Sequence, residues 1–137
     1  MQLDPALVAE TRSWLSKVAK ELAVAAYEST ATPPFGEDIV FHAQQAVEKA
    51  LKAFLTWHGH AFRKTHNLVE LGEACSLIDP TLEALLRRAS PLTEYAWKFR
   101  YPGTPQEPTP DEAADALALA NEVYNQVLSR LPSDVRP

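Results

Sequence analysis

The chain has 137 residues and a formal net charge of −5, a length that fits one domain over residues 1–137 with one hydrophobic core. The acidic balance argues against broad binding to duplex nucleic acid, which depends on many phosphate contacts, but allows a small anionic ligand in a local basic pocket. No apolar run approaches the ~20 residues of a membrane span, the first residues lack a signal-peptide pattern, and the single cysteine has no zinc-like spacing to other ligands. We therefore expect a cytoplasmic protein that uses no membrane, metal or cofactor.

Two long helices are predicted in the first half of the chain. Asp4, followed by a proline in the first helical position, begins a helix that should end near Glu28. A proline-rich loop over 29–36 precedes a second helix that begins near Asp38, because apolar residues then recur at three- and four-residue steps. A polar flank of this second helix, expected to face solvent, carries His42, Gln45, Lys49, Lys52 and Thr56.

Further helical segments are predicted in the second half. Thr65 is the expected N-cap of a short helix, and Asp79 with its following proline begins the next one. Pro91 should break or kink that segment, which then continues as helix to Tyr101. Thr109 begins the last long helix as part of a capping box with a glutamate three residues later.

No strand pattern and no internal repeat are visible. Four long helical segments and one short one predict an all-α fold, an antiparallel four-helix up-and-down bundle with a short extra helix. The tail over 132–137 is expected to be frayed.

The segment 49–69 contains no acidic residue, although the chain as a whole is acidic. Its basic side chains are therefore candidates for binding a nucleotide or another anion, namely Lys49, Lys52, Arg63 and Lys64. The alternative is that these residues form the solvated face of an ordinary bundle helix. His66, in the same segment, is expected to brace the start of the following helix.

Three stretches resemble the HEPN domain family of small all-helical domains. They read FHAQQAVEKALKAFL at 41–55, THNLVEL at 65–71 and LTEYAWKFRYPG at 92–103. The resemblance implies the same helical fold that the periodicity predicts.

Many members of the family are ribonucleases, and the resemblance implies a motif of an arginine, four to six residues and a histidine near a dimer interface. Arginine neutralises the phosphate and histidine moves protons near neutral pH. Arg100 matches the motif arginine, but the three positions for the histidine are Pro105, Gln106 and Glu107. The motif is incomplete. His42 is the alternative histidine if the start of the second helix lies near Arg100.

Arg100 also has a structural interpretation, in which it caps a helix end or pairs with Asp38 or Glu37. Two function classes follow. The first is a module that binds a nucleotide or a partner protein, which the resemblance implies is a minimal nucleotidyltransferase in a toxin–antitoxin-like pair. The second is a metal-independent ribonuclease with a non-standard histidine. The resemblance and two aromatic residues, Phe41 and Trp97, predict a homodimer.

Overall fold

The computed structural model describes residues 2–103 and 106–137, and every regular element within them is helical. The α-helices are α1 (Pro5–Ser29), α2 (Gly36–Trp57), α3 (Leu68–Ile78), α4 (Glu83–Ala89) and α5 (Pro110–Leu128). The short 3-10 helices are η1 (Pro80–Leu82), η2 (Ser90–Ala96) and η3 (Ser133–Val135). The predicted all-α fold is confirmed.

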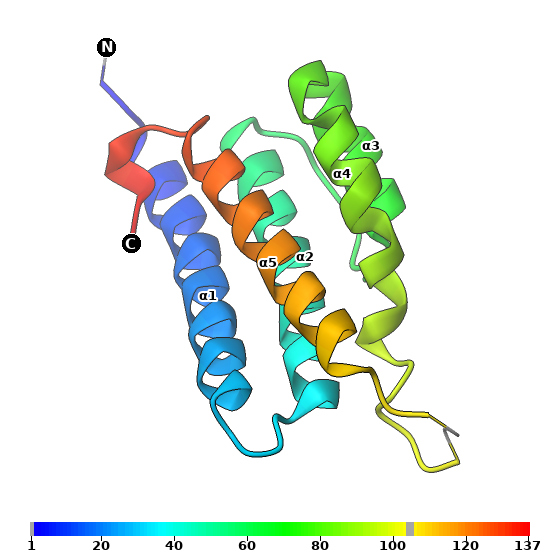
Figure 1. The fold of residues 1–137 in the computed structure, drawn as a ribbon. Helices are drawn as coiled ribbons and strands as arrows, with labels where there is room; N and C mark the ends of the chain where they lie inside the picture. Colours follow the sequence, from blue (N-terminus) through cyan, green and yellow to red (C-terminus); the bar gives the residue numbers. More distant parts are fainter. Residues whose placement is uncertain (1, 104–105) are drawn as a thin grey trace.

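The central helix is α2, which packs against α1, α5, α3 and η2. Figure 1 shows α1 running antiparallel to α2, α5 running in the same direction as α2, and α3 and α4 forming an antiparallel hairpin beside them. Because α2 has neighbours on several sides, it buries residues around most of its circumference, including Ile39, Leu51 and Phe54. Polar side chains on α2 therefore lie between helices or at the edges of their contacts, and this placement decides their chemistry.

The helix starts follow the sequence signals, with one correction. Asp4 accepts a hydrogen bond from the backbone of Ala6, and Thr109 forms the predicted capping box with Glu112. The predicted N-cap of α3 is wrong by two residues. Asn67, not Thr65, accepts the N–H groups at the start of α3, because the asparagine carboxamide lies directly before the first helical turn. The Thr65 hydroxyl instead accepts from the backbone N–H of Asn67.

The segment over 79–101, which was predicted to form one of the four long helical segments, is divided into shorter pieces. The α-helix ends at Ala89, and the chain tightens into the 3-10 helix η2 at Ser90, just before Pro91. The predicted continuation to residue 101 is wrong, because η2 ends at Ala96 and the following residues form turns. Arg100 consequently lies in a turn, where its N–H donates to the carbonyl of Trp97 at 3.0 Å.

The prediction of a frayed tail is also wrong. The tail forms η3, and the Val135 side chain is completely buried. Arg12 on α1 donates a hydrogen bond to the carbonyl oxygen of Asp134. Burial of one apolar side chain and this bond together fix the C-terminal segment against α1.

Candidate functional site

Arg100 lies at the end of the bundle where α2 begins. Its Nη1 donates to Asp38 Oδ1 at 2.8 Å, and its guanidinium carbon lies 4.1 Å from the centre of the Phe41 ring. Asp38 and Phe41 are nearly one helical turn apart, so one face of α2 supplies both contacts. The predicted pairing of Arg100 with Asp38 is confirmed. It engages one of the five N–H donors that a guanidinium carries.

His42 lies beside the same aromatic ring. Its ring centroid is 5.3 Å from that of Phe41, and the two planes meet at 76°. The structure therefore places Arg100 and His42 on one aromatic side chain, although no described contact joins them directly. His42 Nδ1 lies 2.5 Å from Glu21 Oε2 on α1, which makes Nδ1 the ring nitrogen that carries hydrogen.

Glu28 adds a third carboxyl group to this end of the bundle. Burial raises the pKa of Glu28, and the nearby Asp38 carboxylate raises it further, while His42 and Arg100 act in the opposite direction. Its Oε2 atom is buried and has no hydrogen-bond partner among the described residues. The Arg100 site is thus electrostatically mixed, with carboxyl groups close to its cation.

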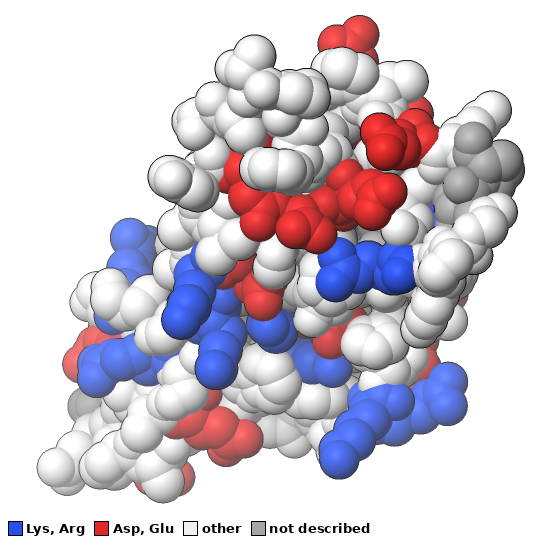
Figure 2. Space-filling model, turned by 90° about the horizontal axis from the view of Figure 1, so that it is seen from below, with Lys and Arg blue, Asp and Glu red and all other residues white. Residues whose placement is uncertain are grey.

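Figure 2 views the molecule from this end and shows the same mixture on a larger scale. A band of acidic side chains lies next to separate groups of basic ones, and no continuous positive surface covers this face. An anion at this end must therefore be held by individual, well-placed donors rather than by a broad field.

Lys49 contacts a carboxylate that the sequence places far away. Its Nζ donates to Glu21 Oε1 at 2.7 Å, so Glu21 is shared between Lys49 and His42. The segment 49–69 contains no acidic residue in the sequence, but in the structure the Glu21 carboxylate lies beside it.

The Lys52 side chain is buried, and the expectation that it faces solvent is wrong. It donates to Glu48 Oε2 at 3.0 Å, and its ammonium lies 5.8 Å from the ring centres of both Trp14 and Phe62. The contact between α1 and α2 covers this stripe of α2, and the connector over 58–67 contributes Phe62. A buried ammonium needs a paired carboxylate, and Glu48 is that partner.

Glu48 also binds the connector. His66 Nδ1 lies 2.6 Å from Glu48 Oε1, and Gln44 Nε2 donates to the same oxygen at 3.2 Å and to the His66 carbonyl at 3.4 Å. The expected bracing role of His66 is therefore extended by a side-chain bond to the interior of the bundle. Gln44 and Glu48 were not predicted as site residues, although the spacing of four residues between Glu48 and Lys52 indicates a favourable pair on a helix.

The remaining predicted basic residues lie on the connector. Arg63 Nε donates to Glu70 Oε1 at 2.7 Å, and Lys64 is exposed. Of the three positions tested for the motif histidine, Gln106 and Glu107 are exposed, and Pro105 lies outside the described residues. The structure thus separates the predicted anion-binding residues into Arg100 at the beginning of α2, Lys49 and Lys52 on α2 itself, and Arg63 and Lys64 on the connector.

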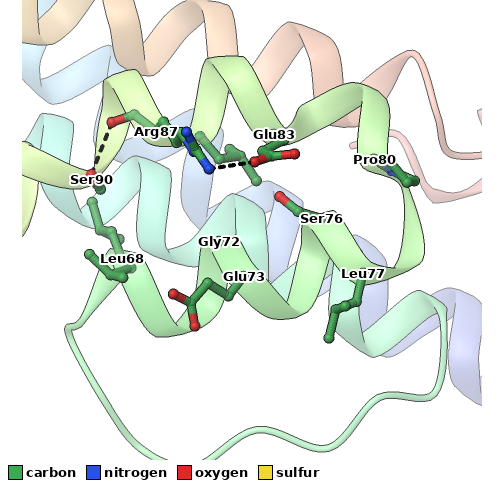
Figure 3. A pocket seen from close by; sticks show the side chains of 11 residues that line it. Leu68, Gly72, Glu73, Ser76, Leu77, Pro80, Glu83, Arg87 and Ser90 are labelled. Atoms are coloured by element: carbon green, nitrogen blue, oxygen red, sulfur yellow. Dashed lines mark hydrogen bonds and ion pairs between the residues drawn. The ribbon is translucent and has the colours of Figure 1, made fainter.

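A groove of about 610 Å³ runs along the outside of the α3–α4 hairpin (Figure 3). Leu68, Leu77 and Leu86 give it an apolar lining, and Arg87 at its rim pairs with Glu83. None of the predicted site residues lines this groove. In the described part of the chain, no group of three or more His, Cys, Asp or Glu side chains could hold a metal ion.

The model of the HEPN domain family matches residues 11–131, from the first third of α1 to just beyond α5. This match spans most of the chain, and the chain belongs to the HEPN domain family. Comparisons with curated proteins and with solved structures gave no match. Among the described residues, no helix is both long enough and apolar enough to cross a membrane.

Proposed function

We propose that the protein is a cytoplasmic HEPN module that binds a phosphate-bearing ligand, a nucleotide or RNA, at Arg100. The observation that carries this proposal is the double support of the guanidinium by Asp38 and Phe41. An arginine held in one orientation loses less conformational entropy on binding, and its planar fork matches a phosphate. The partner in the cell would be a minimal nucleotidyltransferase, in a toxin–antitoxin-like pair.

Binding is favoured over cleavage because the expected histidine is missing after Arg100. Gln106 and Glu107 supply no imidazole. Loss of a proton-transfer residue typically removes about two to four orders of magnitude in rate. A phosphate held at Arg100 without that residue would be bound and only slowly cleaved.

The basic residues of the central segment contribute less directly to this proposal. Lys49, Lys52, Arg63 and Arg100 each bond to a carboxylate, so an anion would have to compete with a carboxylate at all four. Arg100 differs from the other three because it also packs on the Phe41 ring and matches the arginine of the family motif. Lys64 is exposed and adds positive charge beside the connector. Arg100 is therefore the first residue to test.

A homodimer is part of the proposal. Trp97 is 50% exposed, and it lies in the turn region that leads to Arg100. A two-fold interface through this region would cover an aromatic side chain that the single chain leaves in water. Light scattering at tens of micromolar protein should show the mass of two chains, and a monomer at that concentration would contradict this part of the proposal.

The second candidate function is a metal-independent ribonuclease that uses His42. It is favoured by the shared contact of Arg100 and His42 with the Phe41 ring. Glu21 orients the His42 ring, as a carboxylate does for a general base. The described contacts leave His42 mostly sheltered, with 23% of its side chain exposed, and this makes it the less favoured candidate.

The experiment compares the native protein with Arg100→Ala and with Arg87→Ala, an exposed arginine on α4 that serves as the control. A mixed pool of single-stranded RNA in EDTA is used for both binding and cleavage. We expect salt-sensitive binding that is weakened in Arg100→Ala and unchanged in Arg87→Ala, without efficient cleavage.

Cleavage by the native protein that disappears in Arg100→Ala would overturn the binding-only proposal in favour of the ribonuclease. A further loss in His42→Ala would then identify the base. Equal binding by the native protein and Arg100→Ala would reject Arg100 as the site.

A further inference from the structure

His66 combines an exposed ring with a buried hydrogen-bond partner. Its side chain is 63% exposed, whereas the Glu48 carboxylate to which it bonds is only 5% exposed. Of the four histidines, His60 offers the clearest contrast, because within the described part of the chain its Nδ1 contacts the backbone carbonyl of the next residue, Ala61, and no carboxylate. If His66 only held the connector in place, the rest of its imidazole ring would not need to be exposed to water.

The bond to Glu48 fixes which ring nitrogen can act on a ligand. Glu48 Oε1 accepts a hydrogen bond from Gln44, and the other oxygen of the same carboxylate, Oε2, accepts from Lys52. Because the carboxylate is an acceptor, Nδ1 of His66 must carry the hydrogen of their bond. In the neutral ring, Nε2 is then an acceptor. The tautomer and the ring orientation are therefore set before any ligand arrives, as in sites where a carboxylate orients a functional histidine.

His66 and Arg100 lie along the same face of α2. Asp38, Phe41, Gln45 and Glu48 follow one another at steps of three and four residues, and the first two hold Arg100 while the last holds His66. Phe41 and Glu48 are seven residues apart, a rise of about 10 Å along the helix.

The flanking segments meet at the same face. The side chain of Thr93, in η2, accepts a hydrogen bond from the backbone N–H of Leu68, two residues after His66. The segment that leads to Arg100 therefore starts beside the segment that carries His66, with α2 behind both of them. Gln45 is half-buried and lies on the same face of α2 between Phe41 and Glu48, where it adds a side-chain amide.

The rise of about 10 Å between Phe41, which contacts Arg100, and Glu48, which bonds to His66, is longer than one phosphate group. It corresponds to about three nucleotides at ~3.4 Å each. We propose that the surface between Arg100 and His66, which overlies this face of α2, binds a short single strand of RNA, with one phosphate at Arg100 and a ribose 2′-hydroxyl donating to Nε2 of His66. This inference rests on the proposed function, because it uses Arg100 as the phosphate contact. It adds a second contact and the reason that RNA is chosen over DNA, since only RNA has the 2′-hydroxyl.

The test uses fluorescence anisotropy with a labelled RNA hexanucleotide and the DNA of the same sequence. The key variant is His66→Asn, because an asparagine amide donates to Glu48 from nearly the position of Nδ1 but has no counterpart of Nε2. His60→Asn is the matched control. Thermal unfolding of each variant shows whether the fold is kept.

Loss of one neutral hydrogen bond corresponds to about threefold to tenfold in affinity. We expect the native protein to prefer RNA over DNA by that factor, and His66→Asn to bind both as the native protein binds DNA. His60→Asn should behave as the native protein does.

Two different failures are distinguishable. The first failure concerns His66 alone, and in it Arg100→Ala still weakens binding. Either the native protein and His66→Asn prefer RNA equally, or the native protein has no preference between RNA and DNA. In both cases the role of His66 is refuted and the phosphate site stands. If neither nucleic acid binds, or Arg100→Ala binds both as tightly as the native protein, the proposed binding of RNA at Arg100 fails and the role of His66 fails with it.

Discussion

Two glutamates, Glu21 on α1 and Glu48 on α2, each bond to one lysine and one histidine. The two networks differ in how far each of the three side chains is exposed to solvent. In the Glu21 network all three side chains are sheltered to a similar degree. In the Glu48 network the carboxylate and the lysine are almost fully buried, while the histidine lies mostly in water. The same residue types thus form a sheltered cluster in one place and, in the other, a buried anchor for an exposed imidazole.

This difference assigns different roles to similar residues. A lysine whose charge is matched inside the bundle holds the structure together and is poorly placed to attract a ligand. An imidazole that is oriented from inside and exposed outside can meet a ligand without disturbing the core. Burial, not residue type, separates the two roles.

The largest effect is expected from breaking the buried pair. Lys52→Met leaves the Glu48 charge buried without its cation and should lower the free energy of unfolding by about 3–5 kcal/mol. Lys49→Met removes the corresponding cation of the more exposed network and should cost about 1 kcal/mol. Urea unfolding followed by circular dichroism at pH 7 measures both, and equal losses would mean that the two networks do not differ in burial as described.

A smaller effect is expected from Glu21. Burial raises the pKa of Glu21, but hydrogen bonds from Lys49 and His42 outweigh it and hold this pKa below its ordinary value of 4.5. The carboxylate therefore contributes stability above pH 4.5 that is lost as the pH falls through the lowered pKa. Glu21→Gln should cost about 2 kcal/mol at pH 7, in the range for hydrogen bonds to a charged group. The difference from the native protein should shrink on acidification below pH 4.5, and a constant difference between pH 7 and pH 3 would contradict this linkage.

The smallest effect concerns Glu28, whose charged neighbours are Asp38, His42 and Arg100. Burial and the Asp38 carboxylate raise the pKa of Glu28, so ionisation at neutral pH works against folding. This group favours the folded state when it is protonated, and that contribution is lost as the pH rises through the raised pKa. Glu28→Gln should therefore increase stability at pH 7 by about 0.5 kcal/mol, with no gain at pH 3. Loss of stability at pH 7 would show that the Glu28 carboxylate has a favourable partner.

The sequence predicted the elements whose signals are local. Asp4 and the Thr109 capping box mark real helix starts. The apolar repeat of α2 identified the helix on which the core is built. Local signals were misleading where two of them competed, as at Thr65 and Asn67, since both side chains can accept a backbone N–H.

The candidate site was predicted only in part. Arg100 and its pairing with Asp38 followed from the family resemblance and from charge complementarity, because both residues carry their own signal in the chain. The burial of Lys52 and the exposure of His66 carried no such signal. A lysine and a histidine in a basic segment look alike until their neighbours are known.

The sequence by itself determined that this chain forms a helical bundle of the HEPN family, because periodicity, caps and family motifs are properties of short stretches. The tertiary structure alone decided which charges are neutralised and which imidazole faces water. Glu21 lies 28 residues before Lys49 in the chain, and His66 lies 18 residues after Glu48, yet each pair is within hydrogen-bond distance. The energy of a charge depends on its distance to the opposite charge and on its burial, and both are set by how α1, α2 and the connector pack together.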